Sequence, residues 1–157
     1  MRRHLLALPL ILALVPGAAR PQVLVQKNIS LGLARRLAET ALETCRKGGY
    51  QVSVTVLDRA AQTRFSLRDD DAKPHTYEAS QRKAYTALTF RRPSSELEKD
   101  GGGALAAIPG VFMRAGGLPI RSGTEVIGAI GVAGAPGGAA DEVCAGAALD
   151  HVAGELK

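Results

Sequence analysis

QVSVTVLDRAAQTRFSLR occupies residues 51–68 and contains two runs in which apolar and polar side chains alternate. The first run extends from Gln51 to Val56 and the second from Thr63 to Arg68. Alternation with a period of two residues is typical of β-strands, and turn-forming residues fill Asp58 to Gln62 between the runs. The segment therefore predicts a β-hairpin.

Helical periodicity is found on both sides of this hairpin. Ser30 is expected to cap a first helix, in which apolar residues recur at helical spacing up to Gly48 and Gly49. A second helix is expected from about Thr76 to Phe90, and Pro93 ends it because proline lacks a backbone N–H group.

Strands are expected to dominate the C-terminal half of the chain. Glycine-containing turns separate three apolar runs, which we expect to be strands: Val111–Met113, Leu118–Arg121 and Val126–Ala133. Short helical turns are expected at Ser94–Lys99 and Ala104–Ile108, and Asp141 is expected to cap a final helix. The order α-β-β-α-β-β-β-α predicts an α+β domain with an antiparallel sheet of about five strands flanked by helices.

The N-terminal segment has the features of a signal peptide. Arg2 and Arg3 precede an apolar run from Leu5 to Val15, and the small residues Gly17 and Ala19 follow it. A membrane-spanning helix needs about 20 apolar residues, so this run is too short to be a stable anchor. We expect residues 1–19 to be removed and the protein to be exported to the periplasm or secreted.

The remaining residues, 20–157, have the length of a single domain. The formal net charge of the whole chain is +5, of which Arg2 and Arg3 supply two. Basic and acidic residues are interspersed, and three Tyr and three Phe with no Trp provide no basic-aromatic surface. Nucleic acid is therefore not an expected partner.

The two cysteines, Cys45 and Cys144, lie in the first and last expected helices. Export would place them in an oxidising compartment where a disulfide persists. A bond between them requires these two helices to pack side by side on one face of the sheet. The alternative is a nucleophilic Cys144 with His151 on the same helical face, although no orienting carboxylate stands at a matching spacing.

Several segments spread over the chain match the motifs of a known family. They are VSVTVLDR (52–59), PHTYE (74–78), RKAYTA (82–87), GGLPI (116–120), GAIGVAGA (128–135) and DEVCA (141–145). Together they resemble the GlcG/HbpS family of haem-binding proteins, over a span from about Val25 to Leu156. The chain departs from the family pattern at Ala61, where glycine is usual, and at Ala133, where serine is usual.

The resemblance implies a profilin-like layered fold, homo-oligomers and haem as the ligand, with no established reaction. Haem iron accepts an imidazole ligand, and His75 is the candidate because it stands just ahead of the second helix. The alternative for His75 is a surface histidine next to Pro74, and His151 is more easily explained by packing.

Four further residues are candidates for haem contact. Arg82 and Lys83 carry charges that could offset the haem propionates. Lys83 could instead reach across an interface, or lie along apolar surface with its amine in water. Tyr77 and Tyr85 are candidates for contact with the porphyrin edge or for the iron ligand, and core packing is the alternative for both.

Glycines interrupt the last expected strand at Gly128, Gly131 and Gly134. Glycine in a strand indicates that another group approaches the backbone closely. A packed helix, a neighbouring subunit and a flat ligand are the alternatives, of which helix packing is favoured. The run Asp69–Asp71 lacks the ligand spacing of a calcium loop, so a solvated loop is expected there, and the scattered His and Cys do not form a zinc pattern.

Three functions are consistent with these observations. The first is an exported haem-binding protein that serves as a carrier, a scavenger or a sensor subunit. The second is a non-haem ligand-binding or scaffold protein of the same fold, serving an exported redox or uptake system. The third is a weak peroxide enzyme that depends on haem or on Cys144.

Overall fold

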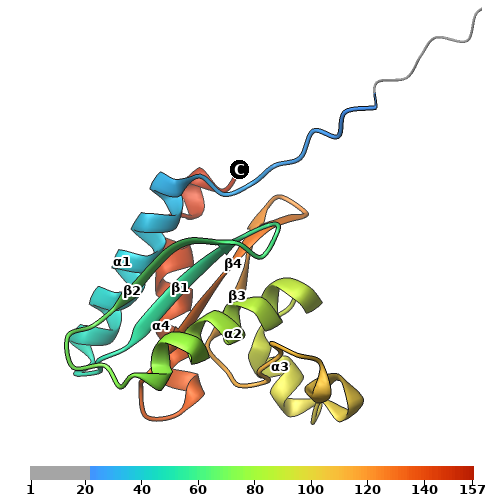
Figure 1. Ribbon diagram of the computed structural model, residues 1–157. Coiled ribbons are helices and arrows are strands. Elements are labelled where there is room, and N and C mark those ends of the chain that lie inside the picture. Colours follow the sequence, from blue (N-terminus) through green and yellow to red (C-terminus); the bar gives the residue numbers. More distant parts are fainter. Residues whose placement is uncertain (1–21) are drawn as a thin grey trace, which may run out of the picture.

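Two β-hairpins join into one antiparallel sheet in the computed structural model, which describes residues 22–157 (Figure 1). The first pairs β1 (Ser53–Asp58) with β2 (Thr63–Arg68), and the second pairs β3 (Gly117–Ser122) with β4 (Glu125–Ala133). β1 and β4 pair in the middle, which makes the strand order β2-β1-β4-β3. The predicted signal peptide lies outside the described residues.

Asp58 holds the turn of the first hairpin. Its Oδ1 accepts hydrogen bonds from the backbone N–H groups of Ala60 at 2.9 Å and Gln62 at 3.0 Å. Between them, Ala61 has a φ of 61°, in the left-handed region that favours glycine. The side chain of Ala61 therefore costs about 1 kcal/mol at this position. The hairpin predicted from residues 51–68 is confirmed, and the left-handed conformation explains why glycine is usual in the family where this chain has Ala61.

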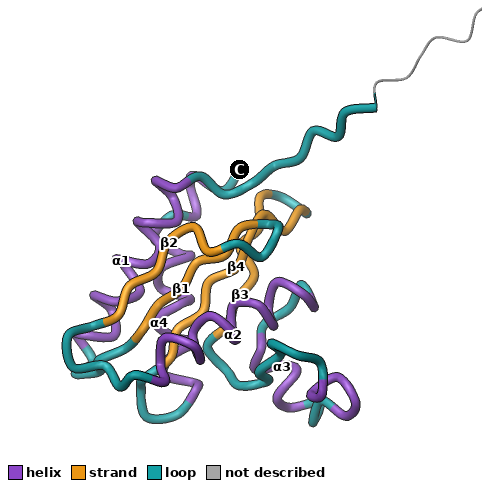
Figure 2. The backbone as a smooth tube through the Cα atoms, in the orientation of Figure 1, coloured by secondary structure: helices purple, strands orange, loops and turns teal. Residues whose placement is uncertain are grey.

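One face of the sheet is covered by α1 (Leu31–Lys47) and α4 (Gly138–His151), which lie side by side (Figures 1 and 2). Most of the buried apolar side chains gather in this layer, including the three valines of the β1 region: Val52, Val54 and Val56. A disulfide between Cys45 and Cys144 links the two helices, with the Cα atoms 5.5 Å apart. The expectation that the first and last helices share one face is therefore confirmed.

The other face carries α2 (His75–Phe90), which lies directly on the strands. A Cβ atom added at Gly131 would stand 2.6 Å from the backbone nitrogen of Ala84, and one added at Gly117 would stand 2.7 Å from the carbonyl carbon of Lys83. Both distances are too short for a real side chain. The close approach predicted at Gly131 is thus the packing of a helix, not a ligand or a subunit.

Hydroxyl groups join α2 to β1 where the layers meet. Ser53 Oγ lies 2.8 Å from Thr76 Oγ1, and Thr55 Oγ1 lies 2.8 Å from Ser80 Oγ. All four side chains are buried. Because buried polar groups need partners, these pairs fix the register of α2 on the sheet.

The sheet has four strands in the described residues where about five were expected, because Val111–Met113 is not a strand. The backbone there bonds to side chains of α2. Phe112 N–H donates to Thr86 Oγ1 at 2.8 Å, and Arg82 Nη2 donates to the Val111 carbonyl at 3.4 Å. A strand neighbour is not required when α2 satisfies these groups.

The remaining elements are short. They are α3 (Ser94–Lys99), a 3₁₀ helix at Gly103–Ala107 and another at Ala153–Glu155. The expectation that Asp141 caps the last helix is wrong, because α4 begins at Gly138 and Asp141 is a buried residue of its first turn. None of the described helices has the length and apolar character needed to cross a membrane.

Candidate functional site

The helix α2 positions all five candidate haem residues, and its helical spacing divides them. His75 and Lys83 line one pocket, together with Ala79 between them. Arg82 and Tyr85 line another pocket. Tyr77 lies outside both and is 45% exposed, so it is not a core residue. The sequence placed the five residues in or just ahead of one helix, but the structure does not bring them to one site.

The first site, here called the His75 pocket, lies between the N-terminal half of α2 and the loop that precedes α4. Its volume is about 490 Å³. The residues that line it are Lys73, His75, Thr76, Ala79, Lys83, Phe112, Arg114, Ala133–Gly138 and Asp141. His75 is the first residue of α2, not a loop residue as expected, and it is exposed. An accessible imidazole, an aromatic ring and several cations therefore surround one cavity.

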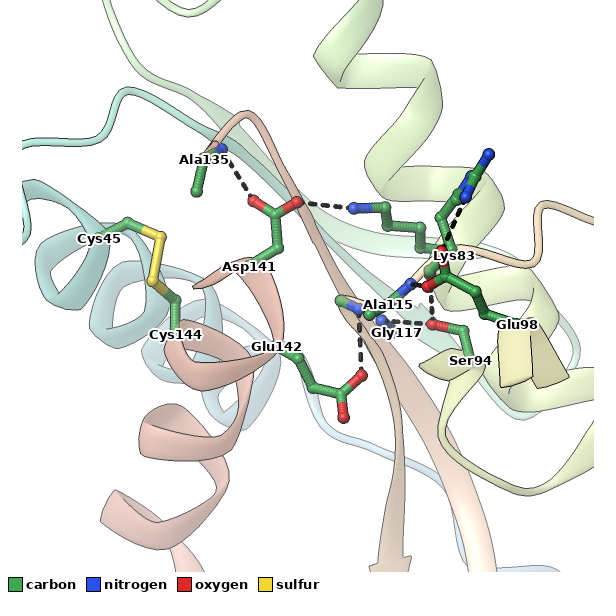
Figure 3. A network of polar contacts seen from close by, with 12 residues as sticks. Cys45, Lys83, Ser94, Glu98, Ala115, Gly117, Ala135, Asp141, Glu142 and Cys144 are labelled. Atoms are coloured by element: carbon green, nitrogen blue, oxygen red, sulfur yellow. Dashed lines mark hydrogen bonds and ion pairs between the residues drawn. A yellow bond between two sulfur atoms is a disulfide. The ribbon is translucent and has the colours of Figure 1, made fainter. Parts of the chain in front are cut away.

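Lys83 forms a buried ion pair at the back of this pocket. Its Nζ donates to Asp141 Oδ2 at 2.7 Å, and the two side chains are 6% and 3% exposed (Figure 3). The interpretation that the Lys83 amine lies in water is wrong, because the carboxylate of Asp141 takes its place. Asp141 Oδ1 also accepts a hydrogen bond from Ala135 N–H at 2.9 Å.

Burial raises the pKa of the Asp141 carboxyl above its ordinary value. The Lys83 ammonium and the backbone donors of the loop before α4 oppose this rise. Desolvation makes the pair sensitive to the loss of either partner, because the remaining charge would be left buried.

Two acidic side chains fix the start of β3 beside this pair (Figure 3). Glu142 Oε2 accepts from Gly116 N–H at 3.2 Å, and Glu98 Oε2 accepts from Ala115 N–H at 2.8 Å. Glu98 also pairs with Arg114 at 2.8 Å, which lowers the pKa of Glu98. Ser94 Oγ completes the arrangement by accepting from Gly117 N–H at 2.8 Å.

The second site, here called the Tyr85 pocket, lies on the opposite side of α2. Its volume is about 530 Å³, and it is lined by Leu57, Ala61, Glu78, Gln81, Arg82, Tyr85, Pro109 and Gly110. Arg82 lies 3.5 Å from Glu78 through Nη1, and its guanidinium carbon is 5.7 Å from the centre of the Phe112 ring. The Nε atom of Arg82 is buried without a hydrogen-bond partner in the described residues.

Several residues differ from their interpretation in the sequence. His151 ends α4 and is exposed, so packing does not explain it. Cys144 is bonded to Cys45 and has no thiolate for nucleophilic chemistry. Asp69 is buried, whereas a solvated loop was expected, because Arg46 Nη2 donates to its Oδ1 at 2.7 Å. Within residues 22–157, no cluster of His, Cys, Asp or Glu is arranged to hold a metal ion.

These features define a class of protein: an α+β domain with a helix-covered antiparallel sheet and ligand-sized pockets on both sides of one helix. The family described as "Haem degrading protein HbpS-like" matches residues 29–150. The chain therefore belongs to the HbpS-like family, as the resemblance to GlcG/HbpS proteins predicted.

Relatives with known sequences or structures agree with this assignment. Protein GlcG of Escherichia coli (strain K12) is 30% identical over 107 residues, which cover 66% of this chain and 80% of GlcG. The crystal structure of HbpS is 39% identical, with a TM-score of 0.81, over 86% of this chain and 98% of HbpS. A PduOC:haem complex has the same fold, with a TM-score of 0.71 and 23% identity, over 78% of this chain and 94% of PduOC.

Proposed function

We propose that this chain is a haem-binding protein and that the His75 pocket holds the haem. The observation that carries the proposal is the exposed imidazole of His75 at a cavity that also contains an aromatic ring and cations. Membership of a family described as haem-degrading and the similarity to PduOC, which was crystallised as a haem complex, support haem as the ligand.

The residues of the pocket fit the chemistry of haem. Bound haem would supply an iron centre, for which a neutral imidazole is an ordinary axial ligand. Phe112 offers an apolar ring surface, and Lys73 offers a charge for a propionate. Lys83 is not assigned to a propionate, since its ammonium is already held by Asp141 at 2.7 Å.

We further propose that the protein is exported and acts as a carrier, a scavenger or a sensor subunit. The predicted signal peptide supports export, and the disulfide between Cys45 and Cys144 is consistent with an oxidising compartment. Homo-oligomers remain part of the proposal because the family resemblance implies them. We assign no catalytic reaction to the pocket.

A haemin titration of the exported form, followed in the Soret band, tests the proposal. His75→Ala is expected to weaken binding strongly, since it removes the proposed iron ligand. His151→Ala is the matched control, because it removes the other histidine of the described residues at an exposed position far along the chain. Saturation near one haem per chain or per subunit pair that depends on His75 alone would support the proposal.

The other outcomes are equally informative. Saturable binding that survives His75→Ala but is lost in Tyr85→Phe would move the haem to the Tyr85 pocket, where a phenol and the Arg82 guanidinium stand together. The absence of saturable binding would contradict haem as the ligand and favour the non-haem ligand-binding protein.

A further inference from the structure

A third pocket lies at the opposite end of α2 from His75. Its lining residues come from the C-terminal end of α2 and from the turns of both hairpins, and its volume is about 580 Å³. Figure 1 shows where these elements lie. Three arginines from different elements line it: Arg59 from the β1–β2 turn, Arg91 from the end of α2 and Arg121 from β3. We call it the arginine pocket.

Positive charge is in excess in the arginine pocket. Among its lining residues, Glu125 is the one carboxylate, and Arg59 Nη1 lies 3.2 Å from Glu125 Oε2. Arg91 and Arg121 form no ion pair within residues 22–157, although Arg121 donates a hydrogen bond to the Arg91 carbonyl. Two guanidinium groups are therefore left without a counter-charge.

Backbone strain is concentrated at the same place. In the described part of the chain, Ala61 and Arg91 are the non-glycine residues with a positive φ, of 61° and 55°. Both line the arginine pocket. Each conformation costs about 1 kcal/mol or more, and such strain clusters at functional sites. At Arg91 the left-handed conformation ends α2 beside Arg121.

An apolar surface accompanies these charges. Tyr85, Leu88 and Val126 line the cavity between the arginine-bearing segments. Guanidinium groups bind carboxylates through two parallel hydrogen bonds, which gives them geometric selectivity for planar oxyanions. An organic anion with two carboxylates and a short carbon chain would match two guanidiniums and the apolar surface together.

We infer that the arginine pocket binds a small dicarboxylate, with one carboxylate on Arg91 and the other on Arg121. Glu125 neutralises Arg59, so two positive charges of the pocket remain to match the two negative charges of the ligand. The site is separate from the His75 pocket, because the two pockets lie at opposite ends of α2 and share no lining residue. The inference therefore does not depend on haem binding in the His75 pocket, whereas the arginine pocket shares Ala61 and Tyr85 with the Tyr85 pocket.

Calorimetric titration of the disulfide-bonded protein with linear dicarboxylates from malonate to adipate tests the inference. Butyrate, inorganic phosphate and sulfate are the comparison ligands. One dicarboxylate length is expected to bind best, on the order of tenfold more tightly than butyrate, because a second charge-assisted contact is made. Arg121→Gln and Arg91→Gln are each expected to weaken that binding by about tenfold or more.

Arg64→Gln is the matched control, because Arg64 is exposed on β2 and does not line the pocket. It removes the same charge and is expected to leave dicarboxylate affinity unchanged. If Arg64→Gln weakened dicarboxylate binding as much as Arg121→Gln, the attraction would depend only on net charge and the inference would be overturned. Affinity for phosphate or sulfate equal to that for the best dicarboxylate would also overturn it, and so would the absence of saturable binding of any dicarboxylate. Haemin titration of Arg121→Gln distinguishes the sites: unchanged haem affinity is expected, and a loss would show that the arginine pocket belongs to the haem site.

Discussion

Replacement of Lys83 by methionine tests the buried ion pair behind the His75 pocket. Methionine keeps an unbranched chain as far as the ε atom but removes the ammonium, so the Asp141 carboxylate is left buried without its counter-charge. The loss of one partner from a buried pair costs about 3–5 kcal/mol. Asp141 keeps its hydrogen bond from Ala135 N–H, which places the expected loss near the lower limit, about 3 kcal/mol.

The assay is urea unfolding at neutral pH under non-oxidising, non-reducing conditions that keep the disulfide. For a domain of this size the expected loss corresponds to a melting temperature lower by roughly 10 °C. Lys73→Met is the control, because Lys73 lines the same pocket but is exposed, and it should change the free energy of unfolding by less than about 0.5 kcal/mol.

The pH dependence gives a sharper test of the same variant. Without the ammonium, burial keeps the pKa of Asp141 in the folded variant above its value in the unfolded chain. The folded variant then binds a proton more tightly than the unfolded variant, so its stability deficit should shrink as the pH falls through the raised pKa. The double variant Lys83→Met/Asp141→Asn should recover at least half of the loss at neutral pH, since the amide oxygen can still accept from Ala135.

Two results would refute this reasoning. A deficit below about 1 kcal/mol would show that the pair is solvated rather than buried. A deficit that is independent of pH and is not recovered in the double variant would show that Lys83 acts through packing of its chain. Added haem should leave the deficit unchanged, because Lys83 is assigned to Asp141 and not to a propionate.

Three further predictions concern the framework around the pockets. Arg46 lowers the pKa of Asp69 in the folded protein, so the stability that Asp69 supplies should be present above its unfolded pKa and lost as the pH falls through the lower folded pKa. The loss of stability caused by Asp69→Asn should therefore vanish in unfolding experiments at acid pH. A loss that persists there would contradict this role of Asp69. Cys45→Ala/Cys144→Ala should lower the free energy of unfolding by about 2–5 kcal/mol in denaturant titrations, because the bond closes a loop with a sequence separation of 99, and reduction of the wild type should match the variant. Gly131→Ala should cost about 1–3 kcal/mol by pushing α2 off the sheet, whereas an unchanged melting temperature would show that α2 does not rest on this strand.

The hairpins and long helices could be predicted because their signals are local. The alternation around Val54 and the helical spacing before Gly48 depend only on neighbouring residues, and both matched the structure. The prediction of a strand at Val111–Met113 was wrong because the conformation of this run depends on α2, which is not a sequence neighbour. Its apolar run resembles a strand, but Thr86 and Arg82 of α2 satisfy the backbone groups there.

The candidate site was only partly predictable. His75 was proposed because imidazole is a ligand for iron, and the structure places it at a pocket, while its role as the iron ligand stays a prediction. The partner of Lys83 could not be found, because Asp141 lies 58 residues away and its spacing carries no signal. The arginine pocket likewise joins residues from three elements, and none of these arginines has a distinctive sequence context.

The sequence by itself determined the family, the order of most elements and the close packing at Gly131, because periodicity, turn residues and missing side chains are properties of short segments. Tertiary structure alone decided that Cys45 bonds to Cys144, that Lys83 is buried against Asp141 and that four of the five haem candidates divide between two pockets. The physical reason is that a pocket or an ion pair depends on the distance between atoms of different elements, and the crossing of α2 over the sheet sets those distances.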